Sequence, residues 1–148
     1  MSVLVDSKGN ANKGREVFRN VCSTCHQIDN EGVNFGPDLS EIGAKLSRQA
    51  LYNSILFPDQ GISFGYEGYR IQLRDGSTAV GRILSETEDQ IDLQYITSQQ
   101  TVDKSQVVSR SQMQNSLMPG NLHSSMSQQE LVDLVEYLSG LNKAMAVR

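Results

Sequence analysis

The sequence Cys22-Ser23-Thr24-Cys25-His26 decides how this chain is interpreted, because it brings two thiols and an imidazole together. The two residues between the cysteines let about one turn of helix separate the thiols. This C-x-x-C-H spacing is used to attach haem, whose two vinyl groups each form a thioether with one cysteine. The histidine then lies where a proximal ligand of the iron is needed. The motif predicts one covalent haem c, bound by Cys22 and Cys25, with His26 as a metal ligand.

Other interpretations of the cysteine pair fit less well. A thioredoxin-like redox site uses C-x-x-C within a βαβ unit, whereas here the pair follows a helical pattern and precedes a glycine-rich stretch. A structural zinc ion needs four ligands, and the chain contains only two Cys and two His. A chance match to the haem motif is the remaining alternative.

The composition fits one globular domain, or a small domain with an insertion. The chain has 148 residues and a formal net charge of −4. It has no run of Lys or Arg, so nucleic acid is not an expected partner, and no apolar stretch long enough to cross a membrane. Because haem of this kind is attached outside the bacterial cytoplasm, we expect a periplasmic or other extracytoplasmic location. We also expect the chain to be a mature or excised fragment, with its export signal elsewhere in the full gene product.

Helical patterns lie on both sides of the motif. Residues 1–11 are polar with little periodicity and are predicted to form a flexible leader. A helix is predicted from Asn12, its expected N-cap, and it runs into the motif with apolar residues on one side. Residues 27–45 contain several Gly and one Pro, which predicts a loop. A second helix is predicted over 47–56, capped by Ser47 and ended by Pro58.

The last helix is predicted to begin after Ser127. The sequence Ser127-Gln128-Gln129-Glu130 is a capping box, and Gly140 is a natural end. Its apolar residues follow at helical spacing: Leu131, Leu134, Val135 and Leu138. Residues 142–148 are predicted to be a tail.

Residues 66–110 change to a period of two. Tyr69, Ile71 and Leu73 alternate with polar residues, which predicts a strand, and Asp75-Gly76 predicts a turn. Two more strands are expected around 80–84 and 91–95, and a shorter run at 102–108 adds a fourth. The prediction is therefore a mainly α domain with a small antiparallel sheet inserted between the second helix and the loop that precedes the last helix.

The second axial ligand of the iron is predicted to come from that loop. Met118 is the leading candidate, because Pro119 fixes the backbone next to it and a sulfur ligand would close the site. Methionine more often fills a core, but this loop is polar. The alternatives are an open site or one of the other possible ligands, which are His123, Met113, Met126, Met1 and Met145.

The loop after the motif offers a partner for the histidine. A ligating histidine usually donates its second N–H to a fixed acceptor, and the carbonyl of Pro37 is the candidate, although Pro37 can equally be a simple turn residue. Leu39 and Phe35 would wall the haem or belong to the core. Tyr52, Arg48 and Tyr69 are weaker candidates for contact with the haem propionates.

Taken together, these pieces resemble a class I cytochrome c over roughly residues 12–57 and 111–141. The resemblance rests on Gly14 and Phe18, the Cys22–His26 motif, Gly36-Pro37-Asp38-Leu39, Met118-Pro119 and Tyr137-Leu138. It implies a domain over 12–141 in which the first and last helices cross. It also implies that Cys22, Cys25, His26, Pro37 and Met118 serve the haem.

The chain is similar, more narrowly, to the planctomycete and verrucomicrobial haem-binding domain, a type that often ends long proteins with a membrane-bound dehydrogenase region. The matching pieces include Tyr66-Glu67-Gly68-Tyr69, Asp75-Gly76, Gly81 and Ser116-Leu117-Met118-Pro119. The strands in mid-chain depart from minimal cytochromes, so the resemblance does not say how they fold.

The expected function is one-electron transfer by a mono-haem cytochrome. The expected partners are a dehydrogenase, fused or separate, or another cytochrome, together with a downstream acceptor. On this interpretation the chain is an electron carrier and not itself an enzyme, although it can be a domain of a larger oxidoreductase. The alternative is a haem-based sensor or peroxidase-like protein with an open or displaceable sixth site. The strands either shield the haem or dock a partner.

Overall fold

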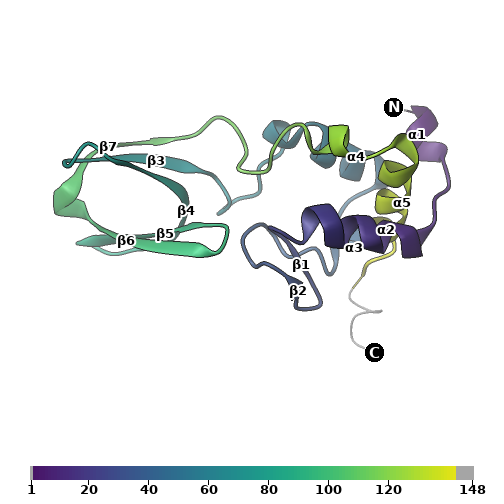
Figure 1. Cartoon of the computed structure of the whole chain (residues 1–148), viewed down its shortest axis with the longest axis horizontal. Coiled ribbons are helices and arrows are strands. Elements are labelled where there is room, and N and C mark those ends of the chain that lie inside the picture. The colour runs from purple at the N-terminus through teal and green to yellow at the C-terminus, as the bar shows by residue number, and fades with distance from the viewer. Residues whose placement is uncertain (1, 143–148) are drawn as a thin grey trace.

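The computed structural model describes residues 2–142. Figure 1 shows an elongated molecule with helices at one end and a curled β-sheet at the other. We call residues 2–60 and 114–142 the helical unit, and residues 66–112 the β unit. The chain passes from the helical unit into the β unit and back, so the haem motif and the last helix share one unit although the sheet separates them in sequence.

The helical unit consists of short helices. They are α1 (Ser2–Asp6), α2 (Ala11–Val17), the π-helix η1 (Phe18–Cys22), α3 (Ile42–Lys45), α4 (Arg48–Leu56), the 3₁₀-helices η2 (Pro58–Gln60) and η4 (Leu122–Ser125), and α5 (Gln128–Ser139). Helices of this length are marginal in isolation and depend on tertiary packing. Their shared core contains the fully buried Phe18, Tyr52, Leu134 and Val135.

The helix ends follow local sequence signals. The hydroxyl of Ser47 accepts from the Ala50 amide at 3.2 Å, so the cap of α4 is confirmed. The capping box of α5 is also present, and Gly140 is its C-cap. The predicted cap of α2 is wrong, because Asn10 and not Asn12 accepts from the Lys13 amide. Residues 2–6, within the stretch predicted as a leader, are helical.

The crossing of α2 and α5 brings the helix that leads into the haem motif against the last helix. Gly14 lies against the Asp133 carbonyl, and a Cβ at that position would collide with it. One turn on, the rings of Phe18 and Tyr137 lie 6.3 Å apart. Next to the crossing, the backbone N–H groups of Gly9 and Asn10 donate to carboxylates on α5. Because a Cβ at Gly14 would collide with α5, only a residue without a side chain lets the two helices pack this closely.

The β unit is a five-stranded antiparallel sheet in the order β6-β5-β4-β3-β7. Its strands are β3 (Tyr69–Leu73), β4 (Thr78–Glu86), β5 (Gln90–Tyr95), β6 (Ser98–Asp103) and β7 (Val107–Gln112), with the 3₁₀-helix η3 (Lys104–Gln106) before the last strand. Neighbouring strands in sequence pair as a meander, and β7 returns to pair with the first strand, β3. The sheet encloses its own core of Ile71, Ala79, Ile91, Leu93 and Val102.

The prediction of a mainly α fold is wrong. The sheet has a hydrogen-bonded ladder between every pair of neighbours in its order and a core separate from that of the helices. The chain is thus an α and β protein with two cores. The prediction failed because a period-two pattern identifies strands but does not show how much structure they build on their own.

Details of the strands also differ from the prediction. The run at 102–108 is not one strand, because it contains the end of β6, the helix η3 and the start of β7. In β4 the residues that join the core are Ala79 and Ile83, whereas the predicted apolar set began at Val80. Val80 and every second residue after it lie on the face opposite to Ala79 and Ile83, since successive side chains of a strand alternate. The loop predicted over 27–45 contains the two-stranded hairpin β1 (Gln27–Ile28) and β2 (Glu31–Gly32), and also α3.

Candidate haem-attachment site

The haem motif begins inside the π-helical turn η1. The Ser23 amide donates to the Phe18 carbonyl at 2.8 Å, which closes the wide turn, and the amides of Cys25 and His26 both donate to the Cys22 carbonyl at 3.0 Å. Single π-turns within helices are frequent at functional sites. Cys22 and Cys25 are free, partly buried thiols on this tight turn. Burial raises the pKa of Cys22 to about 12, so its free thiol is protonated at neutral pH.

His26 is oriented by a single hydrogen bond. Its Nδ1 lies 2.6 Å from the Pro37 carbonyl oxygen. A carbonyl can only accept, so Nδ1 carries the proton and Nε2 keeps its lone pair in the neutral ring. Burial lowers the pKa of His26, although the Pro37 carbonyl and Asp38 oppose that shift. The ring therefore presents one unprotonated nitrogen, as a metal ligand requires, with the acceptor that the sequence suggested.

The segment 33–39 is held against the motif by its backbone. The amides of Val33 and Gly36 donate to the Ser23 and Cys25 carbonyls at 2.8 Å and 2.6 Å. A Cβ on Gly36 would lie 2.6 Å from Cε1 of His26, so the imidazole packs directly on the glycine backbone. Only glycine leaves room for this contact. Gly36 and Pro37 thus fix the plane of the ring from two adjacent residues.

An ion pair ties the helix before the motif to the hairpin after it. The Arg19 guanidinium donates to both oxygens of Glu31, at 2.8 Å and 3.2 Å. The hydrogen bonds from Arg19 lower the pKa of Glu31, and Glu31 raises the pKa of Arg19. Both side chains are exposed, so the pair adds little stability. Its geometry nevertheless holds β2 beside η1.

Met118 lies in the helical unit, in the loop that leads to η4 and α5. It is partly buried and packs against the same apolar cluster as Cys22. Its amide donates to the Ser116 hydroxyl at 3.1 Å, and the Ser116 amide donates to Asp59 of η2 at 2.6 Å. Asp59 therefore anchors this loop. The sequence did not reveal that contact, because an exposed Asp after Pro58 carries no pattern that points to a distant loop.

The other possible axial ligands lie elsewhere. Met126 packs against the helical cluster as Met118 does. A Cβ on Gly68 would lie in close contact with the Met113 sulfur, so Met113 lies beside the start of the β unit. His123 is exposed on η4, and Met1 and Met145 lie outside the described residues. Among the described candidates, only Met118 and Met126 share the apolar cluster with Cys22.

The remaining predicted residues fall into two groups. Leu39 is partly buried against the helical cluster, and Phe35 is buried at the junction with the β unit. Arg48 pairs instead with Glu136 of α5, with Nη2 2.8 Å from a carboxylate oxygen, and the hydroxyl of Tyr69 faces Gln112. Arg48 is thus already paired with a protein carboxylate, and Tyr69 lies at the sheet.

The residues present fit a covalent haem. Two unpaired thiols, an imidazole with a fixed tautomer, and a glycine that admits the ring belong to one continuous stretch, residues 22–37. These are the groups that the attachment chemistry uses. When bound, the haem supplies an iron that alternates between ferric and ferrous states.

The comparisons identify the family. A family model described as Cytochrome c matches residues 11–88, which is more than half of the chain. A search of curated proteins finds no match to the chain. The chain belongs to the cytochrome c family. It is therefore a haem-binding electron carrier with covalently attached haem c. The matched residues include the haem motif, Pro37 and Leu39 but end before Met118.

Residues 2–142 contain no helix with the length and apolar character needed to cross a membrane.

Proposed function

We propose that this chain is a one-electron carrier in which His26 and Met118 are the two axial ligands of a single haem. The observation that carries the proposal is the hydrogen bond from Nδ1 of His26 to Pro37, which leaves Nε2 available to the iron. Met118 packs against the same apolar cluster as Cys22. Ligation by His and Met raises the reduction potential relative to two imidazoles. A closed site favours electron transfer over binding of an outside ligand.

The proposed partners are a dehydrogenase, fused or separate, and a downstream acceptor such as another cytochrome. Support comes from the resemblance to the planctomycete and verrucomicrobial haem-binding domain. The net charge of −4 favours a weak, transient encounter with a basic or mixed surface. We propose an extracytoplasmic location, since covalent haem attachment to this motif takes place there in bacteria. Holo-protein would then accumulate only where the chain is exported.

The axial ligand is tested by absorption spectra of the ferric and ferrous protein with and without carbon monoxide. We expect the unmodified ferrous protein to bind carbon monoxide poorly, because both axial positions are taken. Met118→Ala should open the site and allow ready binding. Met126→Ala and Met113→Ala are the matched controls, and both should leave the spectrum unchanged.

Ready carbon monoxide binding by the unmodified protein would favour the sensor or peroxidase-like alternative. A spectrum that changes in Met126→Ala but not in Met118→Ala would move the ligand to Met126. Asp59→Ala provides a milder test, since it removes the carboxylate that holds Ser116 without touching a sulfur. We expect it to speed carbon monoxide binding while leaving the resting spectrum close to that of the unmodified protein.

A further inference from the structure

One buried N–H of a partly buried cationic side chain in the β unit has no hydrogen-bond partner. Nε of Arg82 on β4 is buried and unpaired, and the guanidinium carbon lies 4.6 Å from the centre of the Tyr66 ring. The face of the Tyr66 ring partly stabilises the positive charge through a cation–π contact. Burial of an arginine N–H without an acceptor is costly, and such groups normally pair with an anion. Among residues 2–142, Arg82 forms no ion pair.

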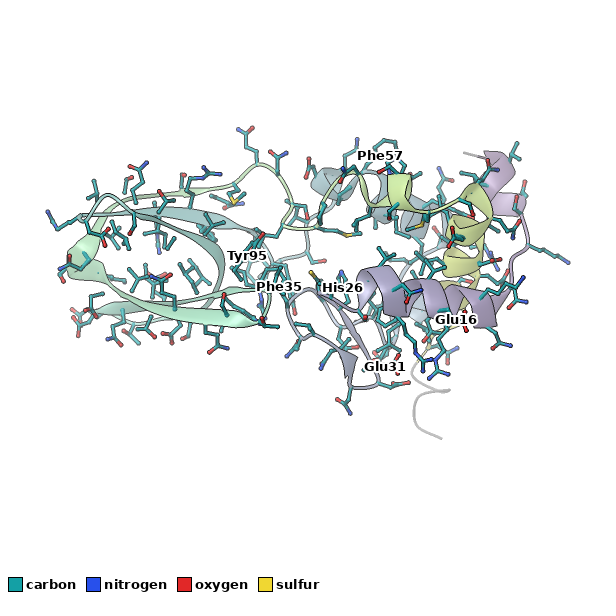
Figure 2. All side chains as sticks on the ribbon, in the orientation of Figure 1. Glu16, His26, Glu31, Phe35, Phe57 and Tyr95 are labelled. Carbon is teal, nitrogen blue, oxygen red and sulfur yellow. The ribbon has the colours of Figure 1, made fainter. Side chains whose placement is uncertain are left out.

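Arg82 lies close to the segment that orients His26. It is the cross-strand partner of Gln94 on β5, so the two side chains share one face of the sheet. Nε2 of Gln94 donates to the Asn34 carbonyl at 3.0 Å. Asn34 comes two residues before Gly36, on which the imidazole packs. Figure 2 shows the same junction, with Phe35 between His26 and Tyr95, whose ring lies 5.9 Å from that of Phe35.

Arg82 also lies close to the segment that leads to Met118. The Arg82 guanidinium lies over the ring of Tyr66, and Tyr66 comes two residues before Gly68. Gly68 is in close contact with Leu117, the residue before Met118, and its carbonyl accepts from the Met113 amide at 2.8 Å. The guanidinium is thus bracketed by the two segments that bear the proposed axial ligands, one through Gln94 and the other through Tyr66.

We propose that Arg82 pairs with a propionate of the haem, so that the β unit completes the haem pocket. The haem carries two carboxylates on one edge, and a guanidinium binds a carboxylate through two parallel N–H groups. The haem would lie between the segments that bear His26 and Met118, and Arg82 lies there as well. Arg82 is a positioning residue for the cofactor. The proposal rests on the proposed function, which places the haem between these two segments.

The arginine that the sequence suggested for this role is already engaged. Arg48 is paired with Glu136, which also accepts from the Gly9 amide. Its unpaired Nη1 and the unpaired Tyr52 hydroxyl belong to that same region, since both Arg48 and Glu136 influence the pKa of Tyr52. Arg82 is the remaining buried polar group without a partner among the described residues.

The test compares two arginine substitutions in the purified holo-protein. Arg82→Leu removes the proposed partner of the propionate, and Arg70→Leu removes an equal charge from an exposed position on β3. Loss of Arg82 leaves a carboxylate uncompensated near the iron, which stabilises the ferric state and lowers the midpoint potential. We expect the ferrous-to-ferric ratio at a fixed ambient potential to fall about tenfold, which corresponds to about 59 mV for a one-electron couple. Arg70→Leu should change it far less.

Arg82→Lys provides the conservative variant. It keeps the charge but replaces the planar fork by a compact ammonium group, so we expect a midpoint between those of the unmodified protein and Arg82→Leu. Equal potentials for Arg82→Leu and Arg70→Leu would overturn the proposal. The carbon monoxide test of Met118 has an independent outcome, so a wrong sixth ligand would not be confused with a wrong propionate partner.

A second measurement needs no substitution. In ¹⁵N NMR spectra of the unmodified protein, a side-chain N–H near the iron shifts between the paramagnetic ferric and the diamagnetic ferrous states. We expect Nε–H of Arg82 to be resolved, slow to exchange with water and shifted by the change of oxidation state, whereas Nε–H of Arg70 is not shifted. If both arginines behave alike, Arg82 does not face the haem. This result decides the matter even if Arg82→Leu fails to fold.

Discussion

The helical unit and the β unit are stabilised in different ways. The helical unit is built from short helices, and partly buried residues that include Cys22 of the haem motif and Met118 pack against its core. The β unit has a ladder of paired strands around a core that contains neither cysteine nor histidine. From this difference we expect cofactor attachment and folding to be coupled in the helical unit, and the β unit to fold around its own apolar residues.

The largest expected effect comes from removing the attachment chemistry. Replacing both Cys22 and Cys25 by Ser should abolish covalent haem, because no thioether can form. The helical unit should then lose ordered packing, while the β unit keeps its sheet. Haem staining after denaturing electrophoresis and amide NMR signals of β3–β7 measure the two effects. Thr24→Ser, at an exposed position of the same motif, is the control and should retain haem. Loss of the β signals together with the helical ones would show that the two units are not separate.

The next comparison truncates one buried residue in each core. Leu134 on α5 and Ile71 on β3 are both 0% exposed, so replacing either by Ala should cost about 2–5 kcal/mol. Leu134→Ala should lower the denaturant midpoint followed by haem absorbance. Ile71→Ala should mainly lower the midpoint followed by signals of the sheet. Val108→Ala, at a position that is 59% exposed, should change neither. Equal shifts of both probes in both variants would mean that the two cores unfold as one.

A smaller effect is expected at the helix crossing. A Cβ at Gly14 collides with the Asp133 carbonyl, which belongs to the backbone and cannot rotate away. Gly14→Ala should therefore push α2 and α5 apart at a cost of about 1–3 kcal/mol, despite the better helix propensity of Ala. Gly120→Ala is the matched control, because a Cβ there meets nothing within 4 Å. Thermal unfolding of the two holo-proteins measures the difference, and a Gly14→Ala protein as stable as the control would show that the crossing adapts.

The local signals in the sequence predicted much of the helical unit. The capping box at Ser127, the cap at Ser47 and the acceptor at Pro37 all depend on residues a few positions apart or on one tight loop, and each is present. The cap of α2 was misplaced by two residues, because Asn10 and Asn12 are equally good candidates by composition.

The β unit was predicted far less well, for a physical reason. The closure of the sheet depends on the pairing of β3 with β7, which joins Tyr69 to Gln112 across the whole insertion. No local pattern encodes such a contact. The same limit hid Asp59, Gln94 and Arg82, whose proposed or observed roles depend on segments distant in sequence. The cofactor motif is local and can therefore be recognised in the sequence. The groups that surround it come from distant segments and cannot be recognised in this way.

The smallest expected effect separates the two units by pH. Glu136 on α5 accepts from the Gly9 amide and from Arg48, and these hydrogen bonds lower its pKa below the ordinary value of 4.5. The stability that they contribute is present above the unfolded-state pKa, and it is lost as the pH falls through the lower pKa of the folded protein.

Glu136→Gln should thus destabilise the helical unit at pH 7 by less than about 1 kcal/mol, since the side chains are partly exposed. The difference should vanish at pH values below the folded-state pKa, where the unmodified carboxyl is protonated in both states. Glu88→Gln, in an exposed turn of the β unit, should have no effect at either pH. Urea unfolding followed by haem absorbance at several pH values measures both, and a Glu136→Gln effect that persists unchanged at low pH would assign the loss to packing and not to charge.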